Sequence, residues 1–190
     1  EVAMNSPAAV PTSASPRVTL GMVGLGRMGA NLVRRAMADG HSTVVYDPQA
    51  AAVEALAAEG SVGTSSLADL VAALPAPRAV WVMVPAGHIT ESVVTELIGL
   101  LEPGDCLIDG GNSYYRDDMR RGELAAAKGI DYLDVGTSGG VWGKDRGYCL
   151  MIGGADRAVD RLAPLWDTIA PGVDSAPRTE GRVGDPAPEE

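Results

Sequence analysis

With 190 residues, 46% of them hydrophobic, the chain is long enough to bury the core of one globular domain. Its net charge of −10 argues against binding to nucleic acid, because phosphates require clustered lysine and arginine. No apolar run approaches the roughly 20 residues of a membrane span, and the N-terminus lacks the pattern of a signal peptide, so we expect a cytoplasmic protein with no membrane partner.

Two segments without a periodic pattern flank the predicted domain. Residues 1–16 are rich in Pro, Ala and Ser, which is typical of a disordered tail. Residues 175–190 combine Pro, Gly and acidic residues, which predicts an interdomain linker, truncated where the chain ends. We therefore expect one folded domain over residues 17–174.

Within that domain, strand-like apolar runs alternate with stretches of helical periodicity. Strands are predicted at 18–23, 43–46, 79–84, 106–108, 132–135 and 148–152. Helices are predicted at 31–39, 50–58, 67–73, 89–101, 118–128 and 158–169. This alternation predicts an α/β fold of the Rossmann type, with a doubly wound, mostly parallel sheet covered on both faces.

The segment GLGRMG follows the first predicted strand and opens the first helix. Its glycines have the G-x-G-x-x-G spacing, in which the first makes a tight turn, the second lets backbone approach a pyrophosphate and the third lets the helix pack closely. N–H groups at the start of a helix favour the anion. A plain glycine-rich turn is the alternative. The predicted cofactor-binding residues here are Gly24, Leu25, Gly26, Arg27, Met28 and Gly29.

Asp47 ends the second predicted strand, 18 residues beyond Gly29. A carboxylate there accepts hydrogen bonds from the adenosine ribose and repels a 2′-phosphate. The next ten residues contain no Arg or Lys that would hold such a phosphate. Because a hydrogen bond to a charged group contributes roughly 1.5–3 kcal/mol, we expect NAD to be preferred over NADP by on the order of 10- to 100-fold. Asp47 also suits the N-cap of a helix that begins at Pro48, and both roles can coexist.

The segment MVPAG ends another strand at the same edge of the predicted sheet, where open α/β sheets bind their ligands. We expect Val84, Pro85 and Ala86 to line the cofactor; a structural turn is the alternative.

The segment DGGNS follows the strand at 106–108. The Asn112 amide offers two donors and an acceptor, so it can bridge a carboxamide and a hydroxyl. Gly110 and Gly111 lack side chains that would block a flat ring. The sequence therefore predicts a cofactor ring placed against a polar substrate at this turn.

The segment GTSGG follows the strand at 132–135. Gly139 and Gly140 leave backbone N–H groups free for a carboxylate, as in an anion nest. Ser138 adds a hydroxyl suited to orienting a polyol. A flexible glycine-rich loop is the alternative.

We expect no catalytic or binding role for the two cysteines or for the paired arginines. Cys106 and Cys149 lie in predicted strands and are expected to be buried thiols, not a disulfide or a nucleophile. No spacing resembles a zinc site, so no metal is predicted. The arginine pairs at 34–35 and 120–121 are expected on solvated helix faces.

Three segments, VGLGRMGANLVRR, DGGNSYYRDD and DVGTSGGVWG, together resemble 6-phosphogluconate dehydrogenase, and more closely its shorter, NAD-linked, decarboxylating type. The resemblance covers about residues 18–188. Related β-hydroxyacid dehydrogenases usually carry an Asp-x-Ser-Thr pattern where this chain has DGGNS. The resemblance implies hydride transfer from C3 of 6-phosphogluconate to NAD, and then loss of CO₂ to leave ribulose 5-phosphate.

The same resemblance implies roles for single residues. Asn112 would contact both the nicotinamide and the sugar acid, and Ser138, Gly139 and Gly140 would bind the substrate. The family uses a Lys and a Glu as base and acid, in a helical domain whose opening pattern this chain does not contain. We therefore assign no catalytic residue and expect NAD binding without turnover.

That helical domain supplies most of the subunit contact in the resembled family, which is a homo-oligomer. We therefore expect this chain to be a monomer or a weak dimer. Two other functions are considered: a β-hydroxyacid dehydrogenase that acts on a smaller acid, and a non-catalytic NAD-binding module.

Overall fold

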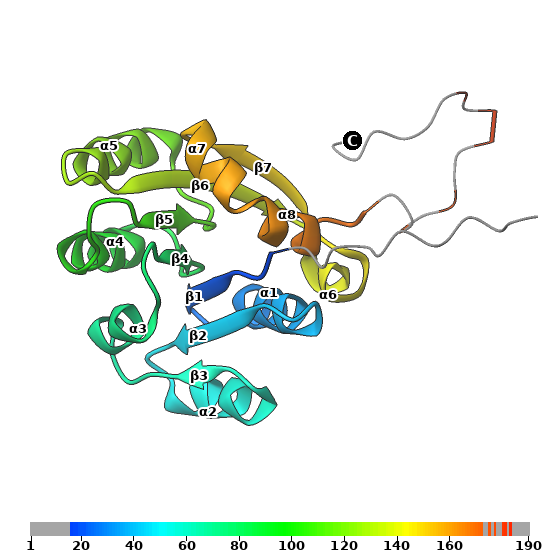
Figure 1. Cartoon of the computed structure of the whole chain (residues 1–190), viewed down its shortest axis with the longest axis horizontal. Coiled ribbons are helices and arrows are strands. Elements are labelled where there is room, and N and C mark those ends of the chain that lie inside the picture. The colour runs from blue at the N-terminus through cyan, green and yellow to red at the C-terminus, as the bar shows by residue number, and fades with distance from the viewer. Residues whose placement is uncertain (1–15, 173–174, 176, 178–179, 182, 184–190) are drawn as a thin grey trace, which may run out of the picture.

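Seven strands form one sheet through the centre of the molecule (Figure 1). In spatial order they are β3 (Val62–Gly63), β2 (Ser42–Tyr46), β1 (Thr19–Val23), β4 (Ala79–Val82), β5 (Cys106–Asp109), β6 (Asp131–Ser138) and β7 (Cys149–Gly153). All neighbours pair in parallel except β6 and β7, which are antiparallel. The strand order reverses between β1 and β4, and a crevice for ligands opens at the carboxyl ends of strands at such a point.

The computed structural model describes residues 16–172, 175, 177, 180, 181 and 183. Of the predicted tail at 1–16, all but the last residue lies outside this range, and so does most of the predicted linker at 175–190. The domain itself, predicted over 17–174, is described almost completely.

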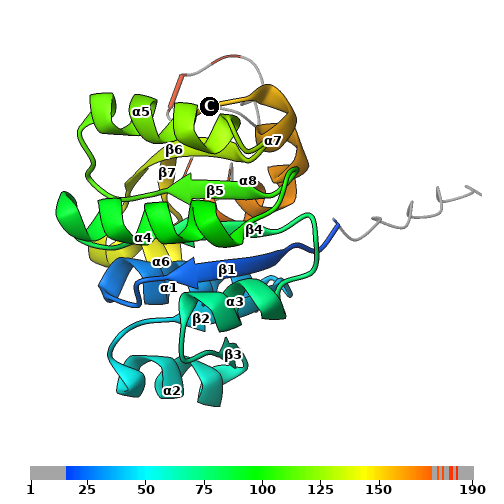
Figure 2. The same ribbon diagram turned by 90° about the vertical axis from the view of Figure 1, so that its left-hand side faces the viewer.

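Helices lie on both sides of the sheet, as Figures 1 and 2 show. One side carries α1 (Arg27–Ala38), α2 (Ala50–Glu59), α6 (Gly143–Arg146), α7 (Asp156–Arg161) and α8 (Ala163–Ile169). The other side carries α3 (Leu67–Ala73), α4 (His88–Leu100) and α5 (Tyr115–Ala126). A short 3-10 helix, η1 (Gly140–Trp142), precedes α6. The predicted doubly wound α/β fold is thereby confirmed.

Side chains alternate between the two faces of the sheet, because successive residues of a strand point in opposite directions. On β4, Trp81 belongs to the core beneath α1 and α8, whereas Val80 and Val82 belong to the core beneath α3 and α4. Trp81 also meets Trp166 of α8 edge to face, with ring centroids 5.6 Å apart. Each strand therefore serves two separate cores, which fixes its register.

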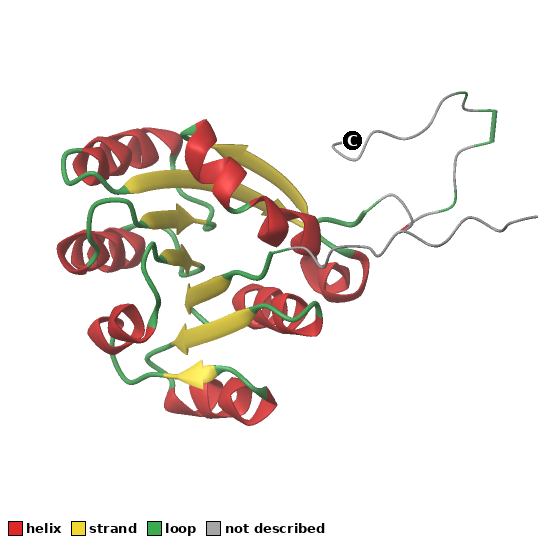
Figure 3. Cartoon of the chain, in the orientation of Figure 1, coloured by secondary structure: helices red, strands yellow, loops and turns green. Residues whose placement is uncertain are grey.

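The predicted strands and helices are found in their predicted order (Figure 3). One difference concerns the last predicted helix, at 158–169, which forms two helices, α7 and α8. Pro164 occupies one of the first two positions of α8, and it lacks the N–H group that a continuous helix would use there. Among the described residues, no helix has the length and apolar composition needed to cross a membrane.

The burial predicted for the two cysteines is right for Cys106 and wrong for Cys149. Cys106 lies in the middle of the sheet, and burial raises the pKa of its thiol to about 12. Cys149 is exposed, because β7 is an edge strand whose outer residues alternate between exposed and half-buried positions. Both thiols are free, as expected.

Candidate functional site

In the glycine turn between β1 and α1, packing within the protein requires glycine at two of the three glycine positions. Gly24 has a φ of +93°, and a Cβ there would overlap the carbonyl group of Met83. A Cβ on Gly29 would overlap the carbonyl oxygen of Gly24. A Cβ on Gly26, by contrast, would meet no atom within 4 Å. The protein itself does not require glycine at position 26, which leaves open space above the turn for a ligand.

Helix α1 starts directly after this turn, and its N-cap, Gly26, makes no side-chain hydrogen bond to the first N–H groups. The first residues of a helix carry N–H groups that its own carbonyls cannot satisfy, and the helix dipole adds positive charge there. Arg27 is exposed and Met28 is half-buried, so both border the open space. This end of α1 can therefore bind an anion such as a pyrophosphate.

Asp47 joins the glycine turn to the loop that follows β2. Its Oδ2 accepts a hydrogen bond from the N–H of Leu25 at 2.7 Å, and its Oδ1 accepts one from the N–H of Gln49 at 2.8 Å. The Leu25 side chain is buried, and its N–H is committed to this bond. Helix α2 begins at Ala50, as the predicted helix at 50–58 does, and its N-cap is Gln49. The alternative role of Asp47, as N-cap of a helix that begins at Pro48, is therefore wrong.

A cavity of about 720 Å³ opens beside Asp47, between α2 and the loop from β3 to α3. We call it the β2–β3 pocket. Its lining residues are Tyr46, Asp47, Pro48, Ala50, Val53, Glu54, Ala57, Gly63, Thr64, Ser65 and Asp69. The volume lies in the range of small-molecule sites. It places an apolar wall from α2 opposite a polar wall that carries Thr64 and Ser65.

The turn after β4 lies next to the glycine turn. A Cβ placed on Gly24 would come within 2.9 Å of the Val84 side chain, so the two turns touch. Val84 is half-buried, while Pro85 and Ala86 are exposed. The Thr90 hydroxyl donates a hydrogen bond to the Pro85 carbonyl oxygen at 2.9 Å and holds the turn in place. These three predicted cofactor residues therefore border the crevice between β1 and β4.

The turn after β5 is organised by the buried carboxylate of Asp109. Its Oδ1 accepts a hydrogen bond from the N–H of Gly111 at 2.9 Å, and its Oδ2 accepts one from the hydroxyl of Ser113 at 2.8 Å. Asn112, between these two residues, is exposed. The buried acid thus holds the residues on both sides of Asn112, Gly111 by its backbone and Ser113 by its side chain, and the exposed amide can meet a ligand.

Gly110 in this turn is required by the core beneath it, which differs from the reason predicted from the sequence. A Cβ on Gly110 would overlap Nε1 of the buried Trp81. A Cβ on Gly111 would lie 3.2 Å from both Asp109 Oδ1 and the Val84 carbonyl oxygen. The space that Gly110 leaves is therefore filled by Trp81, and it does not serve a cofactor ring.

Arg121 of α5 connects the Asn112 turn to α4. Its Nη1 lies 3.3 Å from Asp109 Oδ2 and 3.4 Å from Asp118 Oδ1, and its Nε donates to Glu91 Oε2 at 2.9 Å. The Tyr132 hydroxyl donates to Asp118 Oδ1 at 2.9 Å. These five side chains, which we call the Arg121 cluster, lie directly beneath the turn that carries Asn112.

Burial and hydrogen bonds within the Arg121 cluster shift the pKa values of two of its carboxyl groups. Burial, together with the neighbouring carboxylate of Asp109, raises the pKa of Asp118 to about 6. Its Oδ2 is buried and has no hydrogen-bond partner among the described residues. Hydrogen bonds from Arg120 and Arg121 lower the pKa of Glu91 to about 2. Asp118 thus changes its protonation closer to neutral pH than Glu91 does.

The solvated position predicted for residues 120–121 is wrong for Arg121, which is buried, while Arg120 is exposed. A signal was present in the sequence. Asp118, Arg121 and Ala125 have i, i+3, i+7 spacing, and these are the buried residues of α5. Charged residues on that face were not recognised as partners of Asp109.

The segment at 136–143 packs its glycines against Tyr148. A Cβ on Gly139 would lie 2.7 Å from the Tyr148 ring, and one on Gly143 would overlap that ring. A Cβ on Gly140 would meet nothing within 4 Å, and its φ is +51°. Ser138, Gly139 and Gly140 are all exposed. Ser138 is the last residue of β6 and the two glycines follow it, at the carboxyl end of the strand next to β5, which carries the Asn112 turn.

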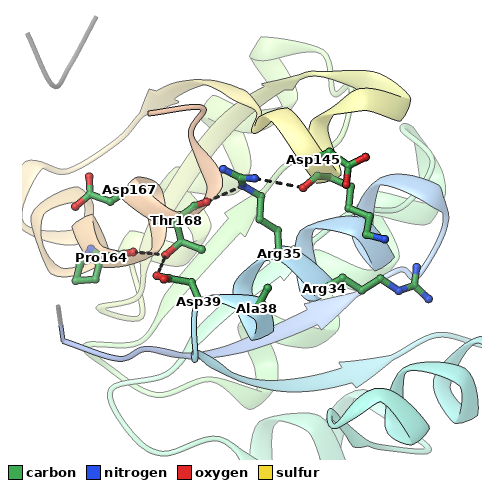
Figure 4. A pocket seen from close by; sticks show the side chains of 9 residues that line it. Arg34, Arg35, Ala38, Asp39, Asp145, Pro164, Asp167 and Thr168 are labelled. Carbon is green, nitrogen blue, oxygen red and sulfur yellow. Dashed lines mark hydrogen bonds between the residues drawn. The ribbon is translucent and has the colours of Figure 1, made fainter. Parts of the chain in front are cut away.

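A second cavity, of about 630 Å³, lies between α1, α6 and α8 (Figure 4). Several of its polar side chains make structural hydrogen bonds. Arg35 Nε donates to the Thr168 carbonyl oxygen at 2.7 Å, and the Thr168 hydroxyl donates to Asp39 Oδ2 at 2.6 Å. Arg34 forms two hydrogen bonds with Glu59, at 2.6 and 2.7 Å. The solvated face predicted for residues 34–35 is therefore wrong for Arg35, which binds the end of α8.

The strand order 3-2-1-4-5-6, with a glycine turn at the reversal point, defines a Rossmann-type domain of the class that binds nicotinamide dinucleotides. The sequence model described as "NAD binding domain of 6-phosphogluconate dehydrogenase" matches residues 19–176. The chain belongs to this family, as the motifs in its sequence indicated.

Relatives and solved structures agree with that assignment. The chain is 42% identical, over 166 residues, to the NAD(+)-dependent, decarboxylating 6-phosphogluconate dehydrogenase of Haloferax volcanii, and the match covers 87% of this chain and 53% of that protein. The chain thus spans about half the length of that relative.

Among solved structures, 6-phosphogluconate dehydrogenase of Plasmodium falciparum, described in complex with NADP+ and with 6-phosphogluconate, has a TM-score of 0.77 at 28% identity. The match covers 84% of this chain and 35% of that one. A 3-hydroxyisobutyrate dehydrogenase of Mycobacterium tuberculosis has a TM-score of 0.75 at 28% identity, covering 82% and 53%. The fold is therefore shared by dehydrogenases that are named for different substrates.

Proposed function

We propose that this chain forms the cofactor- and substrate-binding part of an NAD-dependent, decarboxylating 6-phosphogluconate dehydrogenase. The reaction oxidises 6-phospho-D-gluconate at C3, releases CO₂ and leaves ribulose 5-phosphate. The observation that carries the proposal is the turn after β5, where buried Asp109 holds the exposed Asn112 at the carboxyl edge of the sheet. The name of the Haloferax volcanii relative supports the same reaction.

The β2–β3 pocket supports NAD as the cofactor. Asp47 lies at the end of β2, where an acid accepts hydrogen bonds from the ribose hydroxyls. Its two oxygens already accept backbone N–H groups, and a carboxylate has about four acceptor sites, so it can still bind a ribose. Among the residues that the structure describes, none that lines the pocket is Lys or Arg. A 2′-phosphate would therefore meet an acid without a compensating cation.

The residues of this chain would bind and orient the reactants. When bound, NAD accepts the hydride. The first turn of α1 would hold its pyrophosphate, and the Asn112 amide would fix the carboxamide relative to the substrate hydroxyl. Ser138 and the N–H groups of Gly139 and Gly140 would hold the sugar acid. The carboxylate nearest to Asn112, Asp109, is committed to its own turn and to Arg121, so it is not available as a base.

The structural similarity to a 3-hydroxyisobutyrate dehydrogenase favours a second candidate, a dehydrogenase for a smaller β-hydroxyacid. The two candidates differ in what the site must hold. A sugar acid phosphate offers several hydroxyls and a phosphate, whereas a small hydroxyacid offers one hydroxyl and a carboxylate. The comparison of these two ligands is therefore the direct test.

The test measures binding and turnover on the 190-residue chain. We expect NAD to bind, 6-phosphogluconate to bind the NADH-loaded protein more tightly than 3-hydroxyisobutyrate does, and no NADH to form. Asn112→Ala should weaken 6-phosphogluconate at least about tenfold, because it removes hydrogen bonds to ligand. Preference for 3-hydroxyisobutyrate would favour the second candidate. Turnover by this chain alone would contradict the proposed division between binding and catalysis.

A further inference from the structure

The β2–β3 pocket carries negative charge on more than one of its walls. Of the eleven described residues that line it, Asp47, Glu54 and Asp69 are acidic and the other eight are uncharged. Asp47 comes from the end of β2, Glu54 from α2, and Asp69 from α3. The three carboxylates therefore surround the opening from three different elements.

Asp69 is held in place at its side of the pocket. The Ser65 hydroxyl donates to Asp69 Oδ2 at 2.6 Å, and the Asp69 N–H donates to the Ser66 hydroxyl at 3.0 Å, which caps α3. The hydrogen bonds from Ser65 and Ser66 lower the pKa of Asp69, which keeps it charged. The carboxylate is thus a fixed negative charge at the rim.

Glu54 lies on the opposite wall, one turn into α2, and its side chain is exposed. No ion pair neutralises it among the residues that the structure describes. Its neighbours in the pocket wall, Val53 and Ala57, are apolar. The Glu54 charge is therefore directed at solvent and at whatever occupies the pocket.

We propose that Glu54 and Asp69, in addition to Asp47, exclude a dinucleotide with a 2′-phosphate from this pocket. The inference rests on the proposed function, since it takes the β2–β3 pocket as the site of the adenosine half of NAD. A 2′-phosphate close to Asp47 brings between one and two further negative charges into a space with three carboxylates and no cation among its described lining residues. Like charges at this range repel, and salt screens the repulsion over about 10 Å at 0.1 M.

The two rim acids can be tested separately from Asp47. Asp47 holds the glycine turn through the N–H of Leu25, so its substitution would disturb NAD and NADP binding together. Glu54 makes no described contact with that turn, and the described bonds of Asp69 are to Ser65 and Ser66. Substituting these two acids therefore changes the field in the pocket and leaves the binding turn intact.

The experiment compares wild type with Glu54→Gln/Asp69→Asn, by titration of intrinsic fluorescence with NAD and with NADP at low and high salt. At low salt we expect the ratio of the NADP Kd to the NAD Kd to fall about 4- to 20-fold in the double variant, with the NAD Kd changed less than about twofold. The difference should shrink at 0.5 M salt, because exposed charges are then screened. Thermal unfolding of both proteins confirms that the variant is folded.

The matched control is Glu96→Gln/Asp160→Asn, which removes the same charge from exposed positions on α4 and α7 outside the pocket. Its Kd ratio should equal that of wild type. An equal fall in the control would assign the effect to net charge and overturn the inference. An unchanged ratio in the Glu54/Asp69 variant, with NAD still bound, would also overturn it and leave the proposed function standing. Absence of NAD binding by wild type would instead overturn the proposed function, and this inference with it.

Discussion

Asp47 follows β2 and Asp109 is the last residue of β5, and both carboxylates accept hydrogen bonds from backbone N–H groups. Asp47 accepts from Leu25 in the glycine turn and from Gln49 in its own loop, and Asp109 accepts from Gly111 in its own turn. Asp47 fixes the glycine turn through Leu25, and Asp109 fixes the turn that carries Asn112. Buried or half-buried acids used in this way position other residues of the site. Their substitution is expected to change ligand affinity and stability together, because an unsatisfied N–H group costs about 1–3 kcal/mol.

A substitution at Gly26 is expected to change the NAD affinity of the glycine turn without changing the stability of the protein. Its φ is −60° and a Cβ there meets no protein atom within 4 Å, so Gly26→Ala is expected to change the melting temperature by less than about 2 °C. The methyl group would occupy the space above the start of α1, so the NAD Kd should rise at least about tenfold in a fluorescence titration. Gly99→Ala, in an open position on α4, is the control and should leave the NAD Kd unchanged. Wild-type affinity in Gly26→Ala would place the pyrophosphate elsewhere.

Asp118 gives the domain a pH-dependent stability. Its pKa is about 6 in the folded protein and about 4 in an unfolded chain, so the folded state binds the proton more tightly. The stabilisation that this proton provides is complete below pH 4 and is lost as the pH rises through 6. Asp118→Asn is expected to raise the melting temperature at pH 7.5 by several degrees, equivalent to about 1–2 kcal/mol once solvent screening is allowed for, and to have little effect at pH 4.

Asp117→Asn is the matched control for this measurement. Asp117 lies next to Asp118, but it is only partly buried and pairs with Arg120 at 3.7 Å. Its substitution should produce no gain in stability at pH 7.5. A melting temperature for Asp118→Asn that lies below wild type at pH 7.5 would show that the charged form of Asp118 stabilises the Arg121 cluster.

Helices and strands were predictable wherever one face of an element is apolar. Leu32, Val33 and Ala36 give α1 its helical period, and the β-branched run before Asp47 gives β2 its strand pattern. The segment at 140–146 escaped prediction because η1 and α6 begin at glycines and contain few apolar residues. What holds α6 is the Tyr148 ring against Gly143, a contact between residues with no periodic relation.

The sequence was sufficient to predict which site residues lie at strand ends. It was not sufficient to predict the buried side chains that hold those residues in place. Strand ends follow from the apolar runs, so Asp47 and Asn112 could be placed at one edge of the sheet from the sequence. The Arg121 cluster joins α4, α5, β5 and β6, and only the folded chain shows which charged residue of α5 faces inward. The role of Gly110 was misread for the same reason, because Trp81 lies 29 residues away in the chain.

Arg35 stabilises the C-terminal end of helix α8. Its guanidinium donates to the carbonyl oxygens of Thr168, Ile169 and Ala170, at 2.7, 3.1 and 2.8 Å, where a helix leaves its last carbonyls unsatisfied. Arg35→Lys keeps the charge but not the fork of donors, so we expect a loss of about 1–2 kcal/mol in urea unfolding. The control, Arg34→Lys, weakens a partly exposed ion pair with Glu59 and should cost less than about 1 kcal/mol. Equal losses would show that Arg35 acts only as a charge.

At the scale of the whole molecule, the proposed ligand sites all lie on one edge of the sheet. The glycine turn, the Val84 turn and the Asn112 turn follow β1, β4 and β5, and Ser138 ends β6. These four strands are neighbours in that order. A dinucleotide bound along this edge would contact loops from both halves of the sheet. Ligand binding is therefore expected to stabilise the domain as one unit, against global unfolding.

Chemical labelling of the two cysteines can measure how far NAD binding stabilises the whole domain. Cys149 is exposed and should react with a thiol reagent in the native state, whereas Cys106 is buried in the middle of the sheet and should react only when the domain unfolds. In a Cys149→Ser variant, labelling of Cys106 then measures the unfolded fraction. NAD at 100 times its Kd should slow this labelling about 100-fold, because it lowers that fraction by the factor 1 + [NAD]/Kd. Labelling that NAD does not slow would mean that Cys106 becomes accessible through local opening, while the cofactor edge stays folded.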